Sequence, residues 1–124
     1  MAPSNAPSIL VNCTHGREDA ERATLSFVVG NVSATADQST VVLLTCEGVW
    51  LATNDYAEAI EQPGMPPLRD VLASFVGAGG EIWACGACTG PRGITEPDLI
   101  KGARIVTAAM VVEAMAGGTR TLSF

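Results

Sequence analysis

The run Thr40-Val-Val-Leu-Leu-Thr45 constrains the fold more than any other stretch of the chain. Its apolar residues are continuous instead of alternating, and the first two are β-branched. A strand with one solvated face alternates apolar and polar side chains, whereas a continuous apolar run is typical of a central parallel strand covered on both faces. The run therefore predicts an α/β protein with helices on both sides of a sheet.

The rest of the chain alternates strand-like and helix-like segments around this run. Four further short apolar runs predict strands over residues 8–13, 81–84, 103–106 and 119–124. Helical periodicity predicts helices over residues 18–33, 68–76 and 108–116. Because strand and helix alternate, we expect a three-layer α/β/α sandwich with a mostly parallel five-stranded sheet, flavodoxin-like or Rossmann-like, with right-handed crossovers.

Two of the predicted helices carry apolar surface that needs a partner. The first has a stripe at Leu25, Val28, Val29 and Val32, with Phe27 just off it, and such a stripe faces a core. The helix over residues 108–116 is apolar almost all round, which predicts cover from the sheet and from a neighbouring subunit. Only 16% of the 124 residues are charged, so we expect a homo-oligomer.

Length and charge narrow the classes of protein further. The length suits one domain over residues 8–124, preceded by a flexible tail over residues 1–7. The net charge is −6 and the basic residues are scattered, which argues against nucleic-acid binding. No apolar run approaches the roughly 20 residues of a membrane span. Without a secretory signal at the start of the sequence, we expect a cytoplasmic protein that is not associated with a membrane.

All four cysteines and the single histidine lie at the carboxyl ends of predicted strands or just after them. Cys13 and His15 follow the first strand, Cys46 the second, and Cys85 and Cys88 the third. In an open α/β sheet, ligands bind at the carboxyl ends of the strands. We therefore expect the candidate site at that edge, although the sequence does not tell which strands are neighbours.

The segment Cys85-Gly-Ala-Cys88-Thr-Gly-Pro-Arg92-Gly93 has the composition of a reactive thiol loop. A nucleophilic sulfur must be a thiolate, whose pKa in free cysteine is near ~8.5. Amide groups of a turn containing Gly86, and the fixed charge of Arg92, would stabilise a thiolate or a persulfide anion. Cys88 could then resolve, or pass on, what Cys85 has formed. His15 is a candidate for proton exchange with these sulfurs.

Other interpretations of the same residues stay open. Zinc favours cysteine and histidine in tetrahedral sets, and Cys46, Cys85, Cys88 and His15 could supply one. The Cys85–Cys88 pair could instead cycle through a disulfide as a thiol redox protein, or simply pack inside a non-catalytic binding module. Packing is the favoured role for Cys13. For Arg92, a bridge to a surface carboxylate is the alternative. Glu47 is interpreted as a solvated loop charge, with a place in the binding site as the alternative.

Several segments together resemble the DsrE/DsrF-like family, which includes YchN-like proteins and TusD-type sulfur relay subunits. The similar segments are Leu10-Val-Asn-Cys-Thr-His-Gly-Arg-Glu-Asp-Ala-Glu-Arg-Ala23, Val41-Val-Leu-Leu-Thr-Cys-Glu-Gly-Val49, Cys85-Gly-Ala-Cys-Thr-Gly-Pro-Arg-Gly-Ile94, Asp98-Leu-Ile-Lys-Gly102 and Thr121-Leu-Ser-Phe124. The resemblance covers nearly the whole chain from residue 8 onward. It implies the same three-layer fold, assembled as trimers or hexamers.

The resemblance also implies a function and a site. In sulfur relay members the working cysteine follows the third strand, eight residues before the glycine of an Arg-Gly pair, and Cys85 stands so relative to Gly93. We therefore expect a sulfur carrier or sulfurtransferase that holds sulfane sulfur as a persulfide on Cys85, exchanges it with donor and acceptor proteins and needs no cofactor. The residues expected to line the binding site beside the catalytic Cys85, Cys88, Arg92 and His15 are Thr14, Cys46, Glu47, Gly86 and Gly93.

Overall fold

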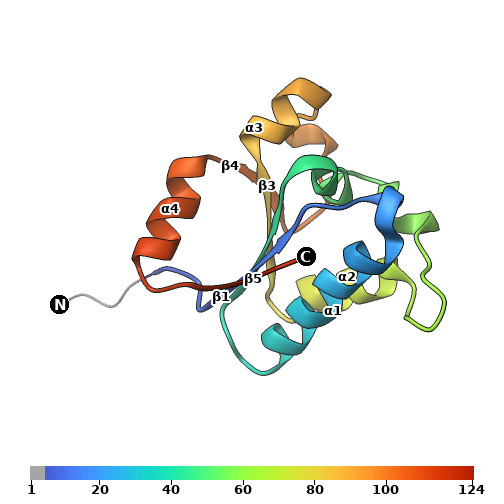
Figure 1. Ribbon diagram of the computed structural model, residues 1–124, viewed down its shortest axis with the longest axis horizontal. Helices are drawn as coiled ribbons and strands as arrows, with labels where there is room; N and C mark the ends of the chain where they lie inside the picture. The colour runs from blue at the N-terminus through green and yellow to red at the C-terminus, as the bar shows by residue number, and fades with distance from the viewer. Residues whose placement is uncertain (1–4) are drawn as a thin grey trace.

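A computed structural model describes residues 5–124 as one sheet with helices on both of its faces (Figure 1). The strands are β1 (Ile9–Cys13), β2 (Thr40–Leu44), β3 (Glu81–Cys85), β4 (Ala103–Val106) and β5 (Arg120–Ser123). The α-helices are α1 (Ala20–Thr35), α2 (Leu68–Gly77), α3 (Gly86–Thr89) and α4 (Ala108–Ala116). The three-layer α/β fold expected from the sequence is confirmed, with each strand within two residues of its predicted bounds.

The sheet runs in the order β4-β3-β2-β1-β5, and every pairing is parallel. The chain steps from β1 to β4 in one direction, and α1 and α2 cover one face during that walk. It then returns across the sheet through α4, which covers the other face and delivers β5 beside β1. Right-handed crossovers require this change of face when the direction of the walk reverses.

The strand that the sequence marked as central is central. All five residues of β2 are buried, and β2 lies between β1 and β3. Val42 and Leu44 face the α1–α2 side, and Val41 and Leu43 face the α4 side. This division explains the continuous apolar run, because alternate side chains enter two different hydrophobic layers.

The face of α1 that enters the core differs from the predicted one. Its buried positions are Ala23, Thr24, Ser26, Phe27, Gly30 and Ala34. A Cβ at Gly30 would stand 3.0 Å from a methyl carbon of Val42, so small residues let this helix approach the sheet closely. The predicted stripe is therefore right only in part: Val28 and Val29 are half-buried against the core, but Val32 is 64% exposed and Phe27, placed off the stripe, is fully buried.

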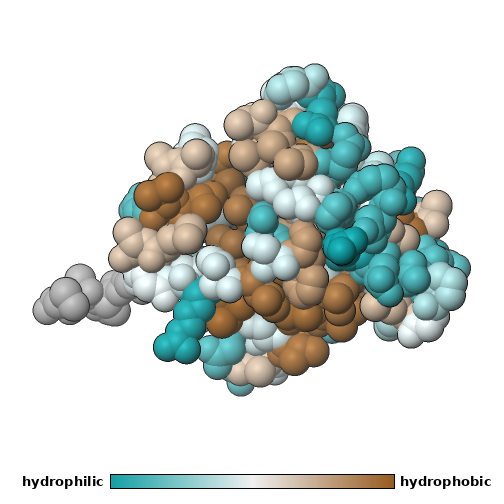
Figure 2. Space-filling model, in the orientation of Figure 1, coloured by the Kyte–Doolittle hydropathy of each residue, from teal (hydrophilic) through white to brown (hydrophobic). Residues whose placement is uncertain are grey.

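The short helix α4 is covered on one side only within a single chain. Ala114 is buried against the sheet, while Val112 and Met115 are 65% and 50% exposed. Figure 2 shows hydrophobic residues gathered over α4 and, separately, along α1 and β5. Within residues 5–124 the outer side of α4 is exposed, and its cover by a neighbouring subunit stays a prediction.

The first residues of the chain are described from Asn5 onward. Residues 1–4 of the predicted tail lie outside the described residues, whereas Pro7 is buried and its carbonyl oxygen accepts a 2.6 Å hydrogen bond from the Thr119 hydroxyl. No helix among residues 5–124 is both long and apolar enough to cross a bilayer. The cytoplasmic location stays a prediction.

Candidate functional site

Three strands bring cysteine-bearing loops to the carboxyl edge of the sheet. Cys13 ends β1 and is paired in register with Leu44, which ends β2. Leu44 is paired in turn with Ala84, one residue before Cys85 at the end of β3. The order β3-β2-β1 therefore makes the loop at Cys46 the neighbour of both other loops. The sequence predicted that the cysteines lie at the carboxyl edge of the sheet. The order of the strands in the sheet now shows which of their loops are neighbours.

A hydrogen bond joins the Cys46 and Cys88 loops directly. The backbone N–H of Cys46 donates a hydrogen bond to the Cys88 Sγ, with 3.1 Å between nitrogen and sulfur. Cys46 has a φ of +52°, a left-handed conformation that few residues other than glycine adopt. This bend turns its amide toward the thiol. The Cys88 sulfur is thus the acceptor of a backbone hydrogen bond from the neighbouring loop.

Arg92 connects the same two loops, but its guanidinium does not bond to a sulfur. Its Nη2 lies 3.0 Å from the Glu47 Oε1, and its Nη1 donates to the Cys88 carbonyl oxygen at 3.1 Å. Among the described residues no hydrogen bond or ion pair joins Arg92 to a thiol. The structure thus places Arg92 as a bridge between a loop carboxylate and the backbone of α3, with its charge balanced by Glu47.

Cys85 lies at the junction of β3 and α3. It is half-buried, occupies the N-cap position of α3, and its side chain packs against the hydrophobic layer under α1 and α2. Gly86 follows because a Cβ there would stand 3.2 Å from the Val106 carbonyl oxygen on β4. Gly93 ends the loop with a φ of +70°, which suits a residue without a side chain.

The residues that end β1 make their own contacts, separate from the thiol loop. Cys13 is fully buried, and its Sγ donates to the His15 carbonyl oxygen at 3.2 Å. Burial raises the pKa of the Cys13 thiol above its usual range. His15 pairs through Nδ1 with Glu18 at 2.8 Å, and Thr14 donates its N–H and its hydroxyl to the Phe124 carbonyl oxygen. These residues hold the turn after β1 and the end of β5.

The alternative metal set is not assembled. Within residues 5–124, no group of three or more histidine, cysteine, aspartate and glutamate side chains is arranged to hold a metal ion. His15 is engaged with Glu18, on the turn after β1, whereas Cys46 and Cys88 meet at the ends of β2 and β3.

Comparison with known proteins identifies the family of this chain. The profile of the DsrE/DsrF-like family matches residues 8–124, nearly the whole chain. The chain belongs to the DsrE/DsrF-like family. Membership confirms the resemblance drawn from the sequence and places the chain in a sulfur-relay-type family.

Two solved structures share the DsrE-like fold. The crystal structure of the ychN protein from E. coli superposes with a TM-score of 0.77 at 17% identity, covering 95% of this chain and 99% of that one. MTH1491 from Methanobacterium thermoautotrophicum, titled a protein of unknown function, gives 0.67 at 16% identity and covers 94% and 97%.

One curated sequence relative matches over part of its own length. The uncharacterized protein MJ0760 from Methanocaldococcus jannaschii is 27% identical over 99 residues, which is 80% of this chain. The chain spans only 36% of that relative.

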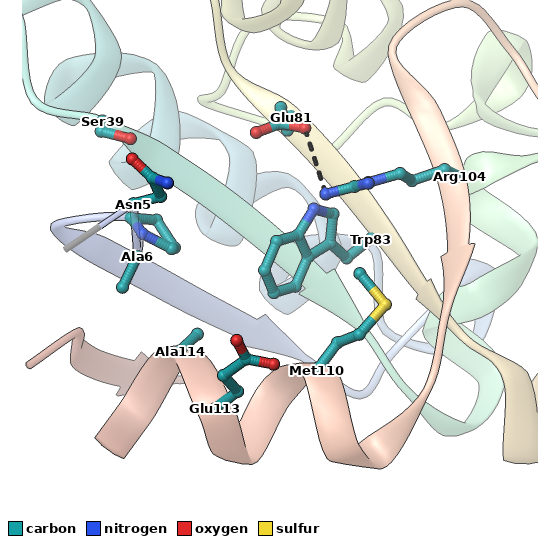
Figure 3. A pocket seen from close by; sticks show the side chains of 10 residues that line it. Asn5, Ala6, Ser39, Glu81, Trp83, Arg104, Met110, Glu113 and Ala114 are labelled. Atoms are coloured by element: carbon teal, nitrogen blue, oxygen red, sulfur yellow. Dashed lines mark ion pairs between the residues drawn. The ribbon is translucent and has the colours of Figure 1, made fainter. Parts of the chain in front are cut away.

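Among the hollows that the described residues line, one adjoins the thiol loop of this DsrE-like domain and another lies far from it. The first, of about 360 Å³, is lined by residues of the loops around Arg92 and Gly93, with Trp50 and Asp98 opposite. The second, of about 370 Å³, opens between α4 and the start of β3 (Figure 3). There the Arg104 guanidinium lies over the Trp83 ring and pairs with Glu81 at 3.7 Å. No thiol lines this second hollow, which is at the opposite end of β3 from Cys85.

Sequence reasoning missed how tightly the β2 loop packs against the end of β1. Gly48 is buried, and a Cβ there would collide with the Cys13 carbonyl oxygen. This close approach fixes the start of the loop and so the position of the Cys46 amide. The dipeptide Glu47-Gly48 was the available signal, because a glycine soon after a strand end often marks a close backbone approach.

Proposed function

We propose that this DsrE/DsrF-like protein is a sulfur carrier whose Cys85–Cys88 pair holds sulfane sulfur as a persulfide. The observation that carries the proposal is the 3.1 Å hydrogen bond from the Cys46 amide to the Cys88 Sγ. Backbone N–H groups in a turn are the kind of donor that binds anions, and this one points at the sulfur of a half-buried cysteine three residues from Cys85. Family membership supports the same class of chemistry.

The chemistry needs two balanced exchanges. The Cys85 thiolate attacks the terminal sulfur of a donor persulfide, R–S–SH, forming Cys85–S–SH and releasing the donor as its thiolate. The Cys88 thiolate then attacks that terminal sulfur, which forms Cys88–S–SH and regenerates the Cys85 thiolate. No oxidant or reductant is consumed in either step. The donor amide lies at Cys88, so Cys88 is the position at which the sulfur rests.

The neighbouring residues have supporting roles in this proposal. Arg92 and Glu47 hold the α3 loop against the β2 loop and so keep the Cys46 amide on the sulfur. Gly86 and Gly93 allow the turn its close approach and its left-handed end. His15 takes no step, because its Nδ1 is paired with Glu18, and Thr14 holds the end of β5.

Intact mass spectrometry tests the proposal directly. Full-length protein is mixed with a low-molecular-weight alkyl persulfide under anaerobic conditions, and samples are denatured soon after mixing. We expect wild type to gain one sulfur atom, Cys85→Ser to gain none, and Cys88→Ser to gain sulfur at Cys85. Cys13→Ala is the matched control and should load like wild type, since Cys13 is sealed in the core. A Cys85→Ser protein that loads as fast as wild type contradicts the mechanism.

We further propose that the chain works as a homo-oligomer, a trimer or a hexamer, and exchanges sulfur with donor and acceptor proteins. Support comes from exposed apolar surface in two places: the outer side of α4, and a nearly apolar hollow of about 490 Å³ between α1 and β5. Val32 and Leu122, 64% and 48% exposed, line that hollow. Single chains would leave this surface in water at a free-energy cost.

Sedimentation distinguishes the assembly from a monomer. Wild type should sediment as a trimer or hexamer at micromolar concentration. Leu122→Glu should shift the protein toward smaller species if the α1–β5 surface is an interface, and Val112→Glu should do so if the outer side of α4 is one. Wild type that sediments as a clean monomer contradicts the assembly and leaves the thiol chemistry untouched.

A further inference from the structure

A third thiol lies beside the proposed persulfide, and neither exchange above uses it. Cys46 is exposed, comes from the loop after β2, and touches the Cys88 Sγ through its own backbone N–H. Because the N–Cα bond is about 1.46 Å long, the Cys46 Cα can be no farther than about 4.6 Å from the Cys88 Sγ given the 3.1 Å contact. That separation is within the reach of a disulfide bond after rotation of two side chains.

We propose that Cys46 is the resolving thiol of this site, which converts the Cys88 persulfide into a Cys46–Cys88 disulfide and releases hydrosulfide. This inference rests on the proposed function, because it needs sulfane sulfur on Cys88. It adds a second outcome for the carried sulfur: transfer to an acceptor thiol, or reductive release as an inorganic product.

The release step balances without another reactant. The Cys46 thiolate attacks the inner sulfur of Cys88–S–SH, and the Cys46 Sγ–Cys88 Sγ bond forms as the bond to the outer sulfur breaks. The bonding pair leaves with the outer sulfur as HS⁻. Two cysteine sulfurs are oxidised to the disulfide while the sulfane sulfur is reduced to sulfide. A dithiol reductant then restores both cysteines by thiol–disulfide exchange.

The contact geometry selects the inner sulfur as the target. The Cys46 amide bonds to the Cys88 Sγ itself, and the Cys46 side chain branches at the Cα, one bond from the nitrogen that contacts the atom to be attacked. The outer sulfur of a persulfide extends beyond Sγ and would depart toward solvent on the exposed side of the loop. Attack on the outer sulfur would only move the persulfide to Cys46 and would release nothing.

The other two cysteines suit this role less well. Cys13 is fully buried under the loop and its thiol donates to the His15 carbonyl oxygen, so it has no path to Cys88. Cys85 is half-buried and packs against the hydrophobic layer under α1 and α2. Cys46 is the only exposed cysteine among the described residues. The Arg92 bridge to Glu47 and to the Cys88 carbonyl keeps its loop beside α3 during the step.

The experiment follows sulfide and disulfide together in the full-length protein. Wild type and Cys46→Ser are loaded with the alkyl persulfide, desalted anaerobically to remove the donor, and incubated without added thiol. Released hydrosulfide is quantified, and intact mass is recorded over time. Tryptic mapping with fragmentation of the linked peptides locates the disulfide: Cys46 lies in the peptide spanning residues 23–69, and fragment ions between Cys85 and Cys88 tell these two apart within the peptide spanning 70–92.

The expected result is distinct for each protein. In wild type the added sulfur mass should disappear as hydrosulfide forms, leaving a chain two hydrogens lighter in which Cys46 and Cys88 link the two peptides. Cys46→Ser should lose sulfide release, and its persulfide should persist. Cys46→Ala should behave like Cys46→Ser, which guards against an effect of the serine hydroxyl.

Each remaining outcome decides between the two proposals. Sulfide release that is unchanged in Cys46→Ser, or a disulfide confined to the 70–92 peptide, overturns the role of Cys46 while the carrier function stands. If wild type and Cys46→Ser neither gain sulfur nor release sulfide, the proposed function itself fails. Stable loading of wild type without any release overturns the resolving role alone.

Discussion

The carboxyl ends of β1 and β3 both present a cysteine, yet the two ends differ in how accessible their thiols are. Cys13 at the end of β1 is fully buried, and a tightly packed glycine of the next loop lies over its carbonyl oxygen. Cys85 at the end of β3 leads into an open loop in which Cys88 is half-exposed and receives an amide hydrogen bond. The difference teaches that a cysteine at a strand end becomes a candidate for chemistry only when the following loop leaves its sulfur accessible.

The comparison is tested most strongly by alkylation. Cys46, Cys85 and Cys88 should react with iodoacetamide in the native protein, whereas Cys13 should react at least about a hundredfold more slowly because its reaction requires opening of the structure. Peptide mass mapping over time measures each rate, and labelling in denaturant is the control for equal intrinsic reactivity. If Cys13 is labelled as fast as Cys46, the β1 end is not sealed.

Two glycine-to-alanine substitutions compare how tightly the loops at the β1 and β3 ends are packed. Gly48→Ala should lower the free energy of unfolding by about 2–4 kcal/mol, because the new Cβ meets the Cys13 carbonyl and backbone must shift. Gly90→Ala in the α3 loop meets no atom within 4 Å and has helical φ and ψ, so it should be neutral or stabilising by less than about 1 kcal/mol. Urea denaturation measures both. Equal losses would show that the two loops are packed alike.

The buried thiol should also make stability depend on pH. Cys13→Ala should cost about 1 kcal/mol at neutral pH through lost packing. Burial raises the pKa of the Cys13 thiol, so the unfolded state ionises first as pH rises above about 8.5 and the free energy of unfolding of wild type falls. The difference between wild type and Cys13→Ala should therefore shrink between about pH 7 and about pH 10.

Urea titrations under reducing conditions at the two pH values measure this effect, with Cys88→Ala as the control at the open end. The gap between wild type and Cys13→Ala should close more than the gap between wild type and Cys88→Ala. A gap that widens for Cys13→Ala has the wrong sign for a buried neutral thiol.

The smallest expected effect concerns the bridge across the open end. Arg92 and Glu47 are partly exposed, so a double-mutant cycle of Arg92→Gln and Glu47→Gln should give a coupling of less than about 1 kcal/mol that weakens with salt. Arg92→Gln alone should cost more than Glu47→Gln, because it also removes the hydrogen bond to the Cys88 carbonyl. If the two single variants lose the same free energy of unfolding, the hydrogen bond from Arg92 to the Cys88 carbonyl contributes nothing to stability.

Much of the fold could be predicted because each element carries a local signal. The continuous apolar run of β2, the period of α2 and the glycines after helices all depend on neighbours in the chain, and these elements were predicted nearly to their bounds. The buried face of α1 could not be predicted in this way. Hydrophobicity favoured its valines, but close approach to Val42 and Phe75 selected Gly30 and Phe27.

In the candidate site, too, the features with a local signal were predicted and those that depend on distant contacts were not. That the cysteines follow strands was visible in the sequence, and the parallel sheet places them at one edge. Cys46 and Cys88 are 42 positions apart, and their contact depends on the left-handed backbone conformation of Cys46. No local sequence pattern predicts that conformation. Arg92 and Glu47 are equally far apart in the sequence. Arg92 was expected to stabilise a sulfur anion, and in the structure it bridges two loops by pairing with Glu47 instead.

By itself, the sequence determined the succession of strands and helices along the chain and which loops carry thiols, because these follow from interactions between residues near one another in the chain. Only the tertiary structure decided which thiols meet, which sulfur receives an amide and which cysteine is sealed. Those outcomes depend on strand order and on the packing of loops tens of residues apart, where contacts are made in space and leave no periodic mark along the chain.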